Sequence, residues 1–357
     1  MRLPERRIIR MMDGEIDASH LGFWANDTTK NRWSNFPWKQ GWKIFTPHLG
    51  VRFDRAYRGE GWRVRDVLPR SPADRGADGL LPGDVVVSID GRQVSPDMDY
   101  AEAMNGPLPH TYRLQVKRPG CEKILSREIK AITFDKARTL LRTAEVEAAK
   151  AAVRRKGNFG YIAIDAMDTE SADKFTDQVF AECFGKDGLV VDVRFNIGGR
   201  TADRLIDILC GNRHERILWR GSDREGYLLD RYARPVIADL PVVVLANERS
   251  QSNAEEFAHA MQTLKRAKVV GMETSGEVIA AVNEYIFDYG VVRRPHVGTF
   301  LPDGRSMEGN GAKPDVKVEL TPADIAAGRD PQLDAALDVL STEVAGRKPS
   351  PPLVYPK

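Results

Sequence analysis

Residues 241–261, PVVVLANERSQSNAEEFAHAM, read as a strand, a polar turn and a helix in succession. The apolar run 241–246 has the length and β-branched content of a strand buried on both faces. After the turn, apolar residues recur at helical spacing, at Ala254, Phe257, Ala258 and Met261. Ser252 lies where the turn enters the helix. A serine here is by default an N-cap. The same place also suits a nucleophile, because free backbone N–H groups there stabilise negative charge.

The composition is that of a globular chain with an ordinary charge balance. With 357 residues and 42% hydrophobic residues, the chain can bury a sizeable core and is expected to hold two domains. Lys plus Arg number 53 against 51 for Asp plus Glu, a formal charge of +2, so we expect neither a nucleic-acid nor a membrane partner. No apolar run reaches the length of a membrane span, and the start lacks the apolar core of a secretion signal.

Three scattered cysteines, Cys121, Cys183 and Cys210, are too few for a disulfide framework or a zinc site. We therefore expect no metal, no cofactor and a reducing, cytoplasmic setting.

The segments before residue 158 differ from one another in composition. Residues 1–48 carry Trp24, Trp33, Trp38 and Trp42, which need a surface to pack on, so this segment is expected to lie on the domains that follow. Residues 49–132 include SPADRGADGLLPGDVVVSIDG, which predicts a short helix over 71–76 and a tight hairpin turn at Asp90–Gly91. This stretch resembles a PDZ domain. That resemblance implies a loop, Leu49, Gly50 and Val51, whose backbone N–H groups receive a peptide's terminal carboxylate. Residues 133–157 are predicted to be a helical linker in which Glu147 and Lys150 can pair at i,i+3 spacing. Residues 346–357 are predicted to be a Pro-rich tail.

From residue 158 to about 345, strands and helices alternate, which indicates an α/β layered domain. Ligands in such folds sit at the carboxyl ends of the parallel strands. Two turns fall at strand ends, the NIGG turn 196–199 and the turn at Ser252, so we expect them to share a cleft. An N–H from Gly198 or Gly199 with one from Asn253 could then form an oxyanion hole. Taken alone, the glycines are better explained by a sharp turn that needs positive φ.

Five motifs keep their order along the chain: DASHLG, VDVRFNIGG, NERSQSNAEEF, MEGNGAKPDVKVEL and GRDPQLDAALDVL. Together they resemble the catalytic half of the tricorn proteases, relatives of the C-terminal-processing serine peptidases. The resemblance implies a crotonase/ClpP-like α/β domain behind the PDZ-like domain, acting as a serine peptidase on peptides or oligopeptides. The base falls on His20 beside Ser19, the nucleophile on Ser252 and a supporting carboxylate on Glu308. The oxyanion donors fall on Gly199 and Asn253.

The sequence departs from this family in several places. Asn253 stands where aspartate is usual, and Ile197 where the turn usually has a third glycine. The processing peptidases use a lysine base, but GMETSGE at the corresponding place has none, which favours histidine. The segment between Gly199 and Ser252 matches poorly, so the side-chain preference stays open. The tricorn propellers have no counterpart, so we expect either a truncated or split product or a chain that works with a separate propeller or proteolytic partner. The resemblance also implies a homo-oligomer.

Two alternatives stay open. The chain could be a catalytically silent scaffold whose PDZ-like domain binds peptides. It could also be a crotonase-like acyl-CoA enzyme, which would leave Ser19, His20 and the PDZ-like domain without a purpose.

Overall fold

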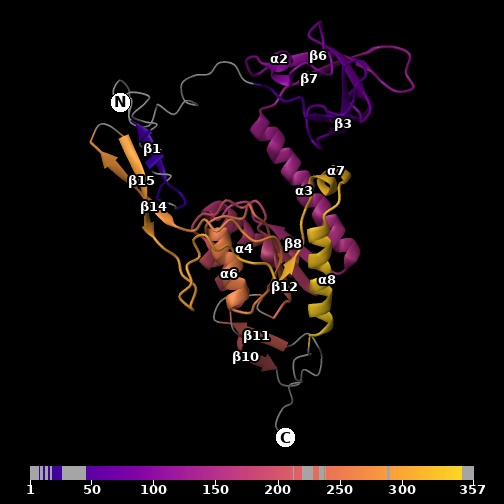
Figure 1. Ribbon diagram of the computed structural model, residues 1–357. Helices are drawn as coiled ribbons and strands as arrows, with labels where there is room; N and C mark the ends of the chain where they lie inside the picture. Colours follow the sequence, from indigo (N-terminus) through magenta and orange to yellow (C-terminus); the bar gives the residue numbers. More distant parts are fainter. Residues whose placement is uncertain are drawn as a thin grey trace. The chain divides into compact units, whose positions relative to one another are not determined.

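The computed structural model describes residues 8, 11–12, 15–16, 18–25, 46–211, 213–218, 228–232, 237, 239–287 and 290–347. The chain divides into two compact units, residues 1–29 with 149–357, and residues 30–148 (Figure 1). Three of the four tryptophans of the opening segment, Trp33, Trp38 and Trp42, lie outside the described residues, as does most of the Pro-rich tail.

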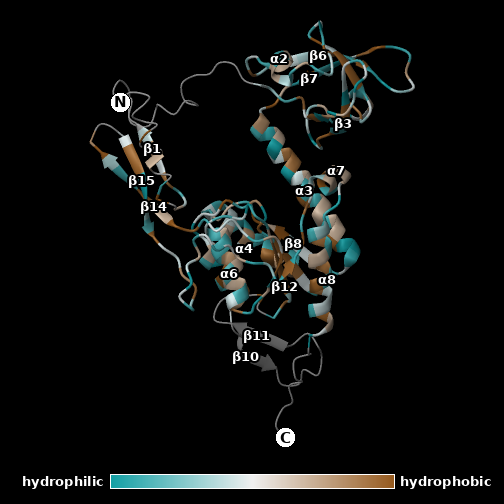
Figure 2. Ribbon diagram, in the orientation of Figure 1, coloured by the Kyte–Doolittle hydropathy of each residue, from teal (hydrophilic) through white to brown (hydrophobic). Residues whose placement is uncertain are grey.

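The larger unit is built on a five-stranded parallel sheet in the order β16–β13–β12–β9–β8. Every residue of β9 and β12 is buried, as the continuous apolar runs predict, and Figure 2 shows the sheet as a hydrophobic band. The strands are β8 Phe159–Ala163, β9 Gly188–Asp192, β12 Val242–Ala246, β13 Lys268–Gly271 and β16 Val316–Lys317.

Helices cover both faces of this sheet. Val191, Val244 and Ala246 share one hydrophobic cluster with residues of α4, α5 and α6. Because side chains alternate between faces, the intervening residues of β9 and β12 point to the opposite face, against which α8 packs (Figure 1). The helices are α4 Thr169–Cys183, α5 Ala202–Cys210, α6 Asn253–Thr263, α7 Pro322–Ala327 and α8 Pro331–Ala345.

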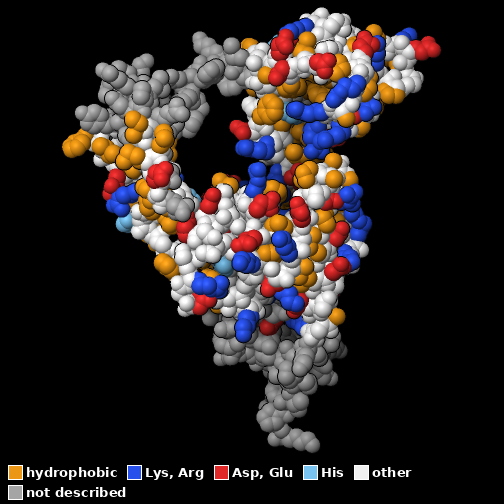
Figure 3. Space-filling model, viewed as in Figure 1, with side chains coloured by type: hydrophobic (Ala, Val, Ile, Leu, Met, Phe, Trp, Pro, Cys, Tyr) orange, Lys and Arg blue, Asp and Glu red, His pale blue; other side chains and the backbone are white. Residues whose placement is uncertain are grey.

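An antiparallel arm brings the beginning of the chain to this unit. β1 Gly22–Ala25 pairs with β15 Gly290–Val297, which pairs with β14 Ala280–Ile286. The arm exposes apolar side chains, including Tyr285, Phe287 and Val297, and orange side chains gather on it in Figure 3. A separate hairpin pairs β10 Arg213–Leu218 with β11 Leu228–Tyr232.

The smaller unit is a β-rich domain with its own core. Its sheet runs β2–β3–β4–β6–β7, with β5 paired to β4. The predicted tight turn at Asp90–Gly91 is present, with φ of 48° and 82° at the two residues. The elements are β2 Val51–Phe53, β3 Trp62–Val67, a 3₁₀ turn Gly76–Asp78, β4 Val85–Ile89, β5 Arg92–Gln93, α2 Tyr100–Met104, β6 Thr111–Lys117 and β7 Leu125–Lys130.

The fold class is as predicted, mixed α/β with a small β-rich domain, and two local predictions are wrong. The short helix expected over 71–76 is a turn followed by the 3₁₀ segment. The linker is one helix, α3 Phe134–Lys156, but its Lys150 binds Glu182 at 2.8 Å instead of pairing with Glu147. Over the described residues, the helices are too short or too polar to cross a membrane.

Candidate active site

Ser252 occupies the N-cap position of α6, directly after β12, in a backbone conformation that non-glycine residues rarely adopt. Its φ is 52° and its ψ −125°. Glu255 accepts the N–H of Ser252, as in a capping box, but the Ser252 hydroxyl makes no cap hydrogen bond. The side chain is partly exposed. A strained backbone that presents a partly exposed hydroxyl at a helix start is typical of a functional serine.

Glu255, one turn into α6, holds this turn from below. It is fully buried, and its two oxygens accept four hydrogen bonds. Oε1 accepts the N–H of Ser252 at 3.0 Å and of Glu277 at 2.9 Å. Oε2 accepts the hydroxyl of Thr274 at 2.6 Å and the N–H of Gly276 at 2.5 Å. These donors satisfy a buried charge that would otherwise be costly.

The NIGG turn between β9 and α5 is fixed by Asn196, which is fully buried. Its amide donates to the carbonyl of Ile164 at 2.8 Å and accepts the N–H of Gly198 at 2.8 Å. The N–H of Gly198 is therefore occupied. Among the described residues, the N–H groups of Gly199 and Asn253 make no hydrogen bond. These two donors are available to a developing oxyanion.

Gly198 brings the two turns into direct contact, with φ of 87°. A Cβ placed on Gly198 would lie 2.6 Å from Cβ of Ser252 and 3.0 Å from the backbone nitrogen of Asn253. Only glycine allows this approach. The structure thus brings together the predicted nucleophile and the predicted oxyanion donors.

Ser19, His20 and Glu308 form a second cluster, built from opposite ends of the chain. The N–H of Ser19 donates to Oε1 of Glu308 at 2.6 Å, and its hydroxyl donates to Oε2 at 3.2 Å. The Ser19 hydroxyl also lies 2.9 Å from Nδ1 of His20. Because that hydroxyl donates to the carboxylate, Nδ1–H of His20 donates to Ser19 Oγ, and Nε2 keeps its lone pair.

Glu308 is held ionised by its donors. Burial raises the pKa of this carboxyl group, but hydrogen bonds from Ser19, Ile279 and Val278 outweigh burial and lower the pKa below its usual 4.5. The N–H groups of Val278 and Ile279 each donate at 2.9 Å. The backbone amides of four consecutive residues, 276–279, therefore donate to two carboxylates. The first two donate to Glu255 of α6 and the last two to Glu308.

His20 and Ser252 belong to the same unit, but no hydrogen bond joins them in the described part of the chain. Catalytic hydrogen bonds are commonly long in the absence of substrate and tighten in the complex. The backbone amides of residues 276–279 connect the Ser252 turn, through Glu255, with the cluster of Ser19, His20 and Glu308.

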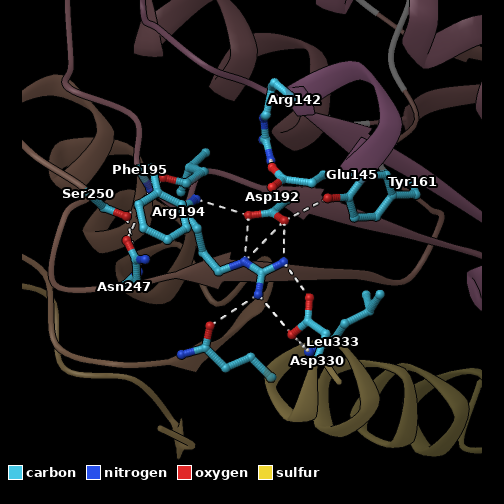
Figure 4. A network of polar contacts seen from close by, with 12 residues as sticks. Arg142, Glu145, Tyr161, Asp192, Arg194, Phe195, Asn247, Ser250, Asp330 and Leu333 are labelled. Carbon is cyan, nitrogen blue, oxygen red and sulfur yellow. Dashed lines mark hydrogen bonds and ion pairs between the residues drawn. The ribbon is translucent and has the colours of Figure 1, made fainter. Parts of the chain in front are cut away.

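A buried ion-pair network is centred on Arg194, just before the NIGG turn 196–199 (Figure 4). Arg194 donates to both oxygens of Asp192, at 2.7–3.1 Å, and to both oxygens of Asp330, at 2.9 Å each. Burial raises the pKa of Asp192, but Arg194 and the hydroxyl of Tyr161 outweigh it, so that the pKa is lowered. The network fastens Asp192, at the end of β9, and Arg194, two residues before Asn196, to Asp330 at the N-cap of α8.

The predicted peptide-binding loop lies in the smaller unit. Leu49 and Val51 are buried, and the N–H of Gly50 donates to Nδ1 of His48 at 2.9 Å. Burial lowers the pKa of His48, which keeps this acceptor unprotonated. An open cavity of about 980 Å³ runs beside edge strand β2 and helix α2. Its lining includes the aromatic side chains Phe53, Trp62, Tyr100 and Phe134.

The sequence pattern did not assign roles to Asn196 or Glu255, although both lie inside quoted motifs. Asn196 bonds to Ile164, and Glu255 accepts hydrogen bonds from loop 274–277. Because these partners are distant in the sequence, no local pattern could reveal either role. Among the described residues, no group of three or more His, Cys, Asp or Glu side chains could hold a metal ion.

Comparison with known proteins finds two family matches and several relatives. Residues 158–318 match peptidase family S41, and residues 63–118 match a PDZ domain. "Tricorn protease homolog 1" of Streptomyces coelicolor is 30% identical over 301 residues, which are 81% of this chain and 27% of that protein. "Tricorn protease" of Thermoplasma acidophilum is 28% identical over 266 residues, 73% of this chain and 24% of that protein.

A "Probable CtpA-like serine protease" of Staphylococcus haemolyticus is 28% identical over 276 residues, 76% of this chain and 52% of that protein. The chain thus spans about a quarter of the tricorn relatives and about half of the CtpA-like one. The crystal structure of the tricorn protease shares the fold, with a TM-score of 0.63 and 24% identity over 84% of this chain and 29% of that chain.

Proposed function

We propose that the chain hydrolyses peptides or oligopeptides with Ser252 as nucleophile. Residues 158–318 match peptidase family S41 and residues 63–118 match a PDZ domain, which supports this proposal. The observation that carries the proposal is the hydrogen-bonded cluster of Ser19, His20 and Glu308, which leaves Nε2 of His20 as a proton acceptor. A surface histidine without a catalytic role would not need a hydrogen-bonded relay behind it.

The chemistry follows from the groups present. Nε2 of His20 takes the proton of the Ser252 hydroxyl as Oγ attacks the peptide carbonyl. The N–H groups of Gly199 and Asn253 then stabilise the oxyanion; losing one such donor costs about 10²–10³ in rate. Glu308, acting through Ser19, orients the imidazole and stabilises its positive charge. His20 returns the proton to the leaving amine, and water releases the acyl group by the same steps.

We also propose that the PDZ domain binds peptides beside β2 and α2, with the loop Leu49–Val51 receiving a terminal carboxylate. The edge position of β2 and the aromatic lining of the cavity support strand addition. A homo-oligomer and a separate propeller or proteolytic partner belong to the same proposal, as does a cytoplasmic location, in keeping with three unpaired cysteines. Sedimentation of the purified chain and cell fractionation test these points.

A fluorophosphonate probe tests the peptidase proposal. We expect the wild-type chain to be labelled, Ser252→Ala to lose all labelling and His20→Ala to lose at least about 10²-fold in rate. Ser126→Ala and His296→Ala, at exposed positions, serve as controls and keep full labelling. A folded wild-type chain that is never labelled would instead support the silent peptide-binding scaffold.

A further inference from the structure

We propose that the side chains of Asn253 and Glu256 form a positioning pair that fastens the oxyanion turn and the Glu308 hairpin to the nucleophile helix. The inference rests on the proposed peptidase function. It concerns the side-chain amide of Asn253, which is distinct from the backbone N–H of the same residue.

The first attachment is to helix α5. Oδ1 of Asn253 accepts the N–H of Ala202, the first residue of α5, at 2.8 Å. Thr201, at the N-cap of α5, makes no side-chain cap hydrogen bond. Asn253 therefore supplies the cap that α5 lacks, from another helix. Because Gly199 precedes this cap by only two residues, the same bond limits where the Gly199 N–H can point.

The second attachment runs through Glu256 to the hairpin that carries Glu308. Nδ2 of Asn253 donates to Oε2 of Glu256, and Oε1 accepts the hydroxyl of Thr299 at 3.1 Å. The carbonyl of Thr299 accepts the N–H of Met307 at 3.0 Å, one residue before Glu308. One side-chain amide thus links the start of α5, the start of α6 and the support of His20.

This geometry requires an amide at position 253. Asparagine offers an acceptor to Ala202 and a donor to Glu256 at once. Aspartate also offers an acceptor to Ala202, but it would set a second carboxylate against Glu256 at hydrogen-bonding distance, and the repulsion would push its side chain away from Ala202. Glutamine at position 256 would still accept from Asn253, because its amide can turn its nitrogen towards the Thr299 hydroxyl.

Four proteins test the pair: the wild type, Asn253→Asp, Glu256→Gln and the double variant, each assayed for cleavage of a peptide library and for labelling by a fluorophosphonate. We expect Asn253→Asp to lower kcat about 10- to 100-fold with KM within about twofold, because the donors shift without loss of binding surface. Glu256→Gln should stay within about twofold. The double variant should recover to within about threefold of the wild type, because the glutamine introduced at position 256 donates to the aspartate introduced at position 253. An Asn253→Asp enzyme as fast as the wild type, or a double variant as slow as the single one, overturns the inference.

Amide hydrogen exchange at Ala202 gives a readout that needs no activity. Exchange should be at least about tenfold faster in Asn253→Asp and should return to the wild-type rate in the double variant, because the cap is lost and then restored. Equal exchange in all four proteins overturns the positioning pair. A wild type that is never labelled overturns the proposed function alone, and the exchange rates still decide on the pair.

Discussion

At the residue scale, the position of Ser252, the proposed nucleophile, depends on the absence of a side chain at Gly198. Gly198→Ala would press a methyl group against Ser252, so we expect kcat/KM to fall about 100-fold from displacement of the reacting groups. Gly185→Ala is the matched control: it also has positive φ, 65°, but its Cβ would meet no atom within 4 Å. The control should lose only about 1 kcal/mol of stability and keep its activity. Equal activity of the two variants would contradict the close approach.

Glu308 gives a pH dependence whose sign follows from its lowered pKa. A carboxyl group with a depressed folded-state pKa contributes stability that is complete above its unfolded pKa, near 4.5, and is lost as the pH falls through the folded value. Glu308→Gln should therefore be less stable than the wild type at pH 7, and the difference should shrink at pH values well below 4.5. Urea unfolding at both pH values measures this.

Ser19→Ala is the control for that experiment, because it leaves the carboxylate its three backbone donors, Ser19, Val278 and Ile279. It should keep most of the pH dependence. A gap between Glu308→Gln and the wild type that widens in acid would reverse the assigned sign.

Single residues differ in how clearly the local sequence predicts their roles. The local pattern places Ser252 and the glycine turn between a buried strand and a helix, but on its own it favours an N-cap and a sharp turn at these places. His20 and Glu308 needed the resemblance, because nothing near either residue marks it. Glu255 carries no signal in the local sequence, and only the folding of loop 274–277 over it makes it a buried acceptor.

At the element scale, the network around Arg194 joins strand β9 to helix α8. Arg194→Ala would leave Asp192 fully buried without its main counter-charge, at a cost of about 3–5 kcal/mol in the free energy of unfolding. The double variant Asp192→Asn, Arg194→Met should lose less, because no buried charge remains unpaired. Urea unfolding of both proteins measures the difference, and a double variant less stable than Arg194→Ala would refute the account.

Elements with strong periodicity were predictable, and those fixed by distant pairing were not. The helix predicted over 171–183 is α4, and the buried runs are the strands β9 and β12. The pairing of β1 with β15 could not be foreseen, because its partners lie more than 260 residues apart and neither strand has a clear alternation. The 3₁₀ segment at Gly76–Asp78 was missed because short turns and short helices share their sequence signals.

At the scale of the whole molecule, each unit has its own hydrophobic core, so we expect two unfolding transitions. Leu114 is fully buried in the core of the smaller unit, and Leu114→Ala should cost about 2–5 kcal/mol there. The transition of that unit should fall by roughly 10 °C or more in calorimetry. Fluorophosphonate labelling at about 25 °C should persist. A single transition that moves as a whole would contradict two independent cores.

The bond between Ser19 and Glu308 spans 289 residues, and this separation has a consequence for biosynthesis. At roughly 5–20 residues per second, a ribosome adds the carboxylate about 15–60 s after the histidine has been made. During that interval Ser19 and His20 lack the carboxylate that holds them. Under the proposed mechanism a half-translated chain therefore cannot yet cut its neighbours, and we expect activity only after residue 308 has been made.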